Sequence, residues 1–182
     1  CQVAGLKLDR LEIEPLALHT LYHSQLSGSQ VKGVLNIGST RSYLAIFQKD
    51  TLVFVRSIGF GCAAFYQYMQ DSGAGNVGLE KLNCLESGME GLMRELVSEL
   101  GRSLEYFRLQ SNHEELSQII LCGGGARLGG IEEFLSREVG VPVQIGDFSS
   151  QVQLADTISA KEKKELIYEY PVALGLAMRG VK

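Results

Sequence analysis

The chain has 182 residues, 45% of them hydrophobic and 21% charged, which is enough to bury the core of one domain or of two small ones. Its net charge of −4 and its lack of a lysine- or arginine-rich run argue against a nucleic-acid-binding protein. No apolar run reaches the length of a membrane span and no secretory signal is present, so we expect no direct membrane insertion. The four cysteines (Cys1, Cys62, Cys84 and Cys122) form no CxxC pair and stand in apolar contexts, which favours buried free thiols in a reducing cytosol over a zinc site.

The first 30 residues predict an extended strand followed by a helix. Hydrophobic residues alternate loosely over 5–14, and Pro15 suits the first turn of a helix over 16–26. His19 and His23 are four apart on this helix, a spacing that can hold a metal, but no third ligand or HExxH glutamate accompanies them. We therefore interpret them as half-exposed helix histidines and predict no metal site. The chain lacks an initiator methionine and its start is typical of the middle of a fold, so we also expect a piece of a longer protein.

The next segment predicts a three-stranded meander with tight turns. The strands are expected over 31–37, 42–48 and 51–58. The first turn consists of Gly38, Ser39 and Thr40. Glycine lets a backbone approach a ligand closely, and free amides together with hydroxyls can surround an anion, so this turn is a candidate phosphate site. An ordinary hairpin is the alternative, and the stretch alone does not separate the two.

The middle of the chain predicts a short helix, a loop and a long helix. Residues 62–69 are typical of the short helix. The glycine-rich segment 71–78 is interpreted as a flexible loop and not as a phosphate loop, because no strand leads into it and no Lys-Ser/Thr follows. Apolar residues then recur every three or four positions over 79–109, which predicts a long helix with one buried stripe. The stripe includes Leu92, Leu96, Leu100 and Leu104.

The last third predicts two strands that alternate with helices. Residues 117–122 predict a buried strand of the parallel type that runs into Gly123, Gly124 and Gly125. Such glycines fit a backbone that passes beneath a flat ligand or adopts a positive φ. A helix over 131–139 and a strand over 141–147 are expected next.

The end of the chain consists of a polar segment followed by a segment of small residues. Residues 149–164 predict a loop, with a turn of helix around 160–166. Residues 170–179 predict a helix of small residues, and we expect Ala173 and Ala177 to pack it against the sheet.

Two of these features together resemble the actin-like ATPase superfamily: the Gly-Ser-Thr turn and the buried strand that ends in Gly-Gly-Gly-Ala. The order strand, GGGARL, GG, helix and GVPV strand, with the closing P-x-A-x-GLA-x-R helix, is most similar to the PilM family of type IV pilus assembly proteins. The similarity covers residues 3–179 and is strongest in the second lobe of that fold.

This resemblance implies a fold and a domain organisation. The fold is expected to be α/β, of the actin-like ATPase or ribonuclease H-like class, with a mixed sheet flanked by helices. Residues 1–30 then correspond to the strand and helix that connect from the first lobe. Residues 31–182 correspond to the second lobe, with a reduced small subdomain over about 62–116. The phosphate hairpin of the first lobe has no counterpart in this sequence.

The resemblance also implies a nucleotide site, with phosphates at the first turn and adenosine between the glycine loop and a helix. The implied cofactor-binding residues are Asn36, Gly38, Ser39, Thr40, Gly123, Gly124, Gly125, Ala126, Glu99, Arg102 and Ser103. Asn36 stands where the family usually has aspartate, so a magnesium ion would lose a carboxylate there. We therefore expect ATP or ADP with weak or absent Mg²⁺, no catalytic residue and no efficient ATPase activity.

The function implied is that of a cytoplasmic scaffold in a type IV pilus or related secretion machine. Such a scaffold would bind nucleotide weakly and lie at the inner membrane through a membrane-protein partner, with self-association left open. Two alternatives remain: an active ATPase or kinase of the same superfamily, and a degenerate actin-like domain that binds no nucleotide.

Overall fold

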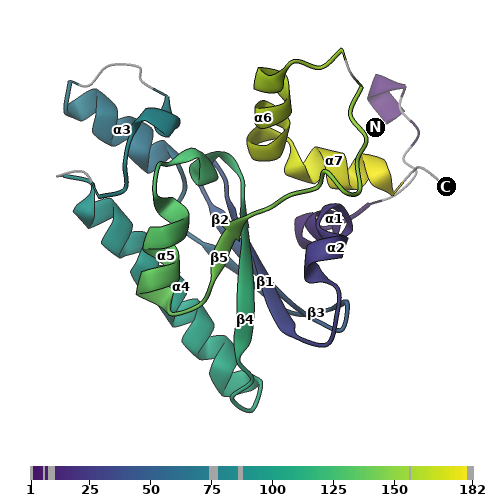
Figure 1. Cartoon of the computed structure of the whole chain (residues 1–182), viewed down its shortest axis with the longest axis horizontal. Helices are drawn as coiled ribbons and strands as arrows, with labels where there is room; N and C mark the ends of the chain where they lie inside the picture. Colours follow the sequence, from purple (N-terminus) through teal and green to yellow (C-terminus); the bar gives the residue numbers. More distant parts are fainter. Residues whose placement is uncertain are drawn as a thin grey trace.

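The computed structural model describes residues 2–5, 7, 11–73, 78–85, 88–155 and 157–179 (Figure 1). The helices are η1 (Gln2–Ala4), α1 (Glu14–Leu21), α2 (His23–Leu26), α3 (Ala63–Asp71), η2 (Leu79–Lys81), α4 (Glu90–Gln110), η3 (Gly124–Arg127), α5 (Ile131–Val139), α6 (Ala160–Glu169) and α7 (Pro171–Met178), where η marks a 3-10 helix. The strands are β1 (Val31–Ile37), β2 (Ser42–Gln48), β3 (Thr51–Ile58), β4 (Leu116–Cys122) and β5 (Val143–Ile145). Within the described ranges, no helix is both long and apolar enough to cross a membrane.

The strands form one mixed sheet in the order β3-β2-β1-β4-β5. The antiparallel meander of β1, β2 and β3 has the predicted bounds, whereas β4 runs parallel to β1 and β5 runs parallel to β4. The turn from β2 to β3 places Lys49 and Asp50 at φ values of 47° and 62°, as a two-residue hairpin turn requires. Because β1 and β4 are parallel neighbours, with Asn36 beside Cys122, the loops that follow them leave the sheet at the same edge.

Helices cover both faces of this sheet (Figure 1). Successive residues of a strand point to opposite faces, so Leu35 and Val34 of β1 belong to two different hydrophobic cores. The larger core lies beneath α3, α4 and α5, and the smaller core lies beneath α1, α2 and the segment that contains α6 and α7. Both cores are built of fully buried aliphatic and aromatic side chains, and three free cysteines, Cys62, Cys84 and Cys122, are buried among them. This confirms the buried thiols for these three, while Cys1 lies outside the described residues.

The long helix is shorter than predicted. Helix α4 begins at Glu90, and the predicted helical segment before it has other structure. It contains η2 and a bridge from Asn83 to Gly129. Gly88, just before α4, has a φ of +97°, which residues other than glycine rarely adopt. The predicted stripe is confirmed within α4: Leu96 and Leu100 are fully buried, and two further leucines, at 92 and 104, pack against the same core. Of the predicted loop over 71–78, residues 74–77 lie outside the described residues.

The strand predicted over 5–14 is wrong where the structure describes it, at residues 5, 7 and 11–14. A strand needs a neighbour for its backbone groups, and the carbonyl of Ile13 instead accepts the N–H groups of Leu16 and Ala17 at 3.1 and 3.4 Å, which begins α1. Pro15 lies in the first turn, as predicted. The rest of the predicted strand, residues 6 and 8–10, falls outside the described residues.

Helix α7 was expected to lie on the sheet through two alanines, and this expectation is also wrong. Ala173 and Ala177 are exposed, and α7 packs on α1 through Gly175. A side chain at Gly175 would overlap the carbonyl oxygen of Ala17, so the two backbones approach each other more closely than any other residue permits. Because α1 already covers this part of the sheet, α7 forms a second layer over α1.

Candidate functional site

A cavity of about 300 Å³ opens at the sheet edge where β1 and β4 end. It is lined by the end of β1, the turn after it, the loop after β4, the start of α3 and the junction of α6 with α7. The lining residues are Asn36, Gly38, Ser39, Cys62, Tyr66, Gly123, Gly124, Arg127, Tyr168, Glu169, Pro171 and Val172. We call this the turn–loop cavity. None of its described lining residues belongs to α5.

Five of the residues predicted to bind a cofactor meet in the turn–loop cavity. They are Asn36, Gly38, Ser39, Gly123 and Gly124. The first three are more than eighty positions from the last two in the sequence, and the parallel pairing of β1 with β4 brings them together. Their role in binding remains a prediction, but the proximity on which that prediction depends is present.

The turn after β1 is fixed by its own carbonyl groups. The N–H of Gly38 donates to the carbonyl of Arg41 at 3.1 Å, which closes the turn. The carbonyls of Gly38 and Ser39 accept the N–H groups of Cys62 and Ala63 at 2.9 and 2.8 Å, at the start of α3. Within the described part of the chain, the N–H groups at positions 39 and 40 have no backbone acceptor. Amides of this kind, beside a serine hydroxyl, can bind an anion.

The glycine loop has a different reason for glycine at each position. Gly123 adopts a φ of +86°, and a side chain there would overlap the amide oxygen of Asn36 and lie 2.6 Å from the carbonyl oxygen of Ile37. At Gly124 a methyl group would meet only the Cys62 sulfur, at 3.4 Å, so the missing side chain leaves room in the cavity. Gly125 has no such freedom, because a side chain there would overlap Ile37.

The other predicted residues lie outside the cavity lining. Thr40 is exposed beyond the turn, while Gly125 and Ala126 are buried beneath the loop. The three residues proposed on α4 are also absent from the lining, and their groups are paired within the helix. Arg102 forms an ion pair with Glu99 at 2.9 Å, and the buried hydroxyl of Ser103 donates to the carbonyl of Glu99 at 2.7 Å. The structure therefore does not bring these side chains to the glycine loop.

Asn36 has a partner that the sequence reasoning missed. Its amide Nδ2 donates to the Oε1 of Glu14, the first residue of α1, at 2.7 Å. Asn36 is buried and Glu14 is half-buried, so this is a charge-assisted hydrogen bond in a partly desolvated place. A carboxylate is therefore present beside position 36, although it is not the side chain at position 36. No local pattern links these residues, which are 22 positions apart and meet only because α1 packs on the end of β1.

Three further lining residues were missed at the opposite wall. Arg127 Nη2 forms an ion pair with the Oε1 of Glu169 at 2.8 Å, and its guanidinium carbon lies 5.4 Å from the ring centroid of Tyr168. Arg127 follows the Gly-Gly-Gly-Ala run directly, so its place in the loop was a usable signal. The sequence offered no such signal for Tyr168 and Glu169, because α6 was predicted only as a turn of helix.

The charges of the cavity are nearly balanced. Arg127 is the sole lysine or arginine among the described lining residues, and Glu169 neutralises it. Burial raises the pKa of the Cys62 thiol and of the Tyr66 phenol, so both groups are neutral near pH 7. An anion would therefore meet backbone amides, a hydroxyl and one cation that is already paired.

The histidines predicted to be half-exposed lie away from this cavity. Nε2 of His19 and Nε2 of His23 approach the Oδ1 of Asp50 at 3.3 and 3.6 Å. The side chain of His19 is largely buried against the ring of Phe47, whereas that of His23 is about half-exposed. The prediction of a half-exposed side chain is therefore confirmed for His23 and wrong for His19. In the described ranges, histidine, cysteine, aspartate and glutamate form no group of three or more that could hold a metal ion.

Comparison with known proteins identifies both a family and a fold. The sequence model of the family described as type IV pilus assembly protein PilM matches residues 1–181. A solved structure of a PilM–PilN type IV pilus biogenesis complex matches with a TM-score of 0.85 and 28% identity, over 100% of this chain and 55% of that one. The ethanolamine utilization protein EutJ from Carboxydothermus hydrogenoformans matches with a TM-score of 0.57 and 19% identity, over 95% of this chain and 57% of that one. MreB5 of Spiroplasma citri bound to ADP matches with a TM-score of 0.63 and 16% identity, over 97% and 61%.

These matches confirm the predicted fold class, an actin-like α/β domain with a mixed sheet flanked by helices. The identities to EutJ and MreB5 are low, so those two likenesses concern the fold alone. This chain spans little more than half the length of each of the three proteins.

Proposed function

Since this chain belongs to the PilM family of type IV pilus assembly proteins, we propose that it is a nucleotide-binding scaffold that docks an inner-membrane partner in a type IV pilus machine. In this proposal residues 31–182 form the second lobe of the actin-like fold, and the scaffold lies on the cytoplasmic side of the membrane. The similar PilM structure was solved with PilN, which supports a PilN-like partner for this chain.

The observation that carries the nucleotide part is the meeting of the β1 turn and the glycine loop in the turn–loop cavity. The residues present fit a phosphate group: the N–H of Ser39, which has no backbone acceptor in the described part of the chain, the Ser39 hydroxyl, and the space that Gly124 leaves open. A volume of about 300 Å³ is at the lower end of small-molecule sites. MreB5, which shares the fold, was solved with ADP.

The same residues favour weak binding with little dependence on magnesium. Bound magnesium would neutralise phosphate charge, but hard cations prefer carboxylate oxygens, and Asn36 offers a neutral amide in their place. The Nδ2 of this amide donates to Glu14, so only its neutral Oδ1 is left for a cation. Backbone amides and the Ser39 hydroxyl would hold the ligand, and Asn36 would keep the end of β1 in place.

A titration of fluorescent ATP tests this proposal, with magnesium in one arm and a chelator in the other. Wild type should bind in both arms with similar, weak affinity. Gly124→Ala should weaken binding severalfold, because the methyl group occupies the cavity while the fold tolerates it. Gly101→Ala on the exposed face of α4 is the matched control, since a methyl group there meets nothing within 4 Å.

Two results would contradict the proposal in different ways. Absence of binding in both arms would favour the degenerate domain without a nucleotide. Strong, magnesium-dependent binding with steady release of phosphate would favour the active ATPase. The partner is tested separately, by co-purification of this chain with the cytoplasmic segment of its PilN-like protein.

A further inference from the structure

Helix α6 contacts the cavity through the end of the helix alone. Its last two residues, Tyr168 and Glu169, both contact the side chain of Arg127: the guanidinium carbon lies over the Tyr168 ring, and Nη2 pairs with the Glu169 carboxylate. Arg127 is 21% exposed and Glu169 is 43% exposed, so the pair sits at the mouth of the cavity and not in the core. We call these three residues the Arg127 latch.

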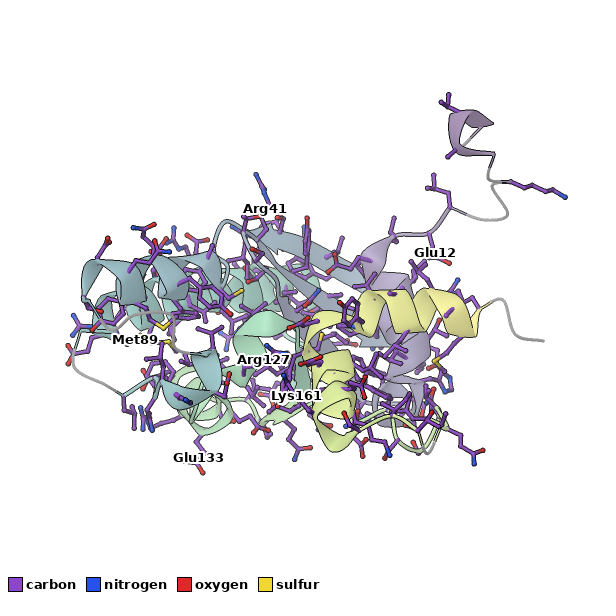
Figure 2. The ribbon with its side chains drawn as sticks, turned by 90° about the horizontal axis from the view of Figure 1, so that it is seen from above. Glu12, Arg41, Met89, Arg127, Glu133 and Lys161 are labelled. Atoms are coloured by element: carbon purple, nitrogen blue, oxygen red, sulfur yellow. The ribbon has the colours of Figure 1, made fainter. Side chains whose placement is uncertain are left out.

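The Arg127 latch lies between two cavities. Arg127 and Tyr168 line both the turn–loop cavity and a second cavity of about 290 Å³, which Lys161 and Glu165 of α6 also line. Figure 2 shows Arg127 and Lys161 near the place where the glycine loop meets α6, with Glu133 pointing away on α5. A ligand longer than a single phosphate would therefore extend along Arg127.

We propose that the Arg127 latch is opened by the nucleotide: the ligand takes Arg127 from Glu169 and Tyr168, and the end of α6 is released. This inference rests on the proposed function and adds the regulation of the same site. A guanidinium binds phosphate oxygens in the geometry in which it binds a carboxylate, and it stacks on flat rings. A nucleotide offers both kinds of group, so it competes for both contacts that α6 now makes.

The energetics allow such an exchange. An ion pair with one partner nearly half-exposed contributes little to stability, so Glu169 holds Arg127 weakly enough to be displaced. Phosphates carry more charge than one carboxylate, and the turn amides hold them at the other end of the cavity. Glu169 therefore lowers the affinity of the site for anions by competition, without occupying the phosphate position itself.

The release of α6 has a route to the rest of the molecule. Helix α7 follows α6 directly, and the N–H of Leu174 donates to the carbonyl of Tyr170 at 2.9 Å between them. Helix α7 in turn packs on α1 at Gly175. Opening of the latch thus removes the polar contacts of the end of α6 with Arg127 and leaves it held by the packing of Leu166 and Ile167 on the smaller core, while α7 stays fixed on α1.

The test combines two substitutions in a double-mutant cycle on this chain, with ATP, inorganic triphosphate and adenosine as separate probes. Glu169→Gln removes the competing charge and should tighten ATP binding about two- to fivefold, the range of a weak ion pair. Arg127→Gln should weaken ATP binding, and in its background Glu169→Gln should have no further effect. Glu133→Gln, an exposed glutamate on α5, is the control for a loss of charge elsewhere. If Glu169→Gln changes the affinity for triphosphate as it changes the affinity for ATP, the competition is at the ion pair. If it changes the affinity for adenosine, the competition is at the Tyr168 ring.

Hydrogen exchange supplies a readout that does not depend on affinity. In wild type, the backbone amides of α6 should exchange faster when ATP is bound, and in Glu169→Gln they should exchange faster without ATP. Equal ATP affinity in wild type and Glu169→Gln would refute the proposal that nucleotide opens the latch, and it would leave the proposed nucleotide binding standing. A gain that persists in the Arg127→Gln background would also overturn it, because general charge repulsion would then be the cause. Absence of binding to every protein would overturn the proposed function and the latch together.

Discussion

The hydrogen bond from Asn36 to Glu14 makes a sharp prediction for Asn36→Asp, the substitution that restores the acid usual in the family. An aspartate there would place a second carboxylate where an amide now lies 2.7 Å from a carboxylate oxygen. The change removes a hydrogen bond to a charged acceptor, worth about 1.5–3 kcal/mol, and adds like-charge repulsion. Two charges 4 Å apart repel by about 4 kcal/mol at an effective dielectric constant of 20, and water at the half-buried Glu14 reduces this. We expect a loss of about 2–4 kcal/mol in the free energy of unfolding at pH 8.

The sign of the pH dependence follows from the repulsion. Two adjacent carboxylates raise the pKa of one of them in the folded state above its value in the unfolded chain. The folded protein then retains a proton that the unfolded chain releases, so the loss of stability grows as the pH rises above about 4. Urea unfolding at pH 5 and pH 8 should show a larger deficit at pH 8.

A second substitution and a metal serve as controls for this prediction. Glu14→Gln combined with Asn36→Asp exchanges donor and acceptor, so it should restore most of the lost stability. Magnesium can bind both carboxylates of the single variant and should stabilise it more than it stabilises wild type. Equal stability of Asn36→Asp and wild type at pH 8 would refute the reasoning, because the two side chains would not then be in contact.

The remaining predictions concern the layer of helices over the smaller core. Gly175→Ala should reduce the free energy of unfolding by about 1–3 kcal/mol, because its methyl group overlaps the carbonyl of Ala17. Gly101→Ala, on the exposed face of α4, is the control and should be neutral or stabilising by up to ~1 kcal/mol. Comparable urea midpoints for the two variants would contradict the close approach of α7 to α1. Burial lowers the pKa of His19 below its ordinary value of 6.5, against the opposing effect of Asp50, so its contribution to stability is complete above pH 6.5 and is lost as the pH falls through the lowered pKa. His19→Phe should therefore flatten the loss of stability between pH 6.5 and 5 in the same assay, and an unchanged pH profile would count against it.

Local sequence patterns were sufficient for the sheet and for the helix stripe. The meander was predicted to the residue because each strand is bounded by a turn, and the leucines of α4 repeat with the helical period. The meeting of the two site loops was implied by the resemblance to the actin-like superfamily, and the structure produces it through the parallel pairing of β4 with β1. These features depend on neighbours in the sequence or on general rules of sheet topology.

The errors concern contacts between distant segments. The alternation before Pro15 looked like a strand, but no pattern in the sequence says whether a partner strand is present. The small residues of α7 indicated close packing, and the structure places that packing at Gly175, with α1 as the partner in place of the sheet. Glu14 and Glu169 reach the site across 22 and 42 residues, to Asn36 and to Arg127. Charged residues on helices occur everywhere, so only the packed structure distinguishes these two.

The contact of α7 with α1 also has a consequence for the order in which the chain folds. The side chain of Arg179 donates a hydrogen bond to Thr20 across 159 positions, so the outer layer joins segments near both ends of the described chain. During synthesis the sheet and α4 can assemble from residues already made, whereas α7 packs on α1 only after its own residues, up to Met178, have left the ribosome. Contacts of such separation form late, since a long loop must close before they stabilise anything. Until then α7 does not cover its side of α1, to which a chaperone or a neighbouring nascent chain can bind.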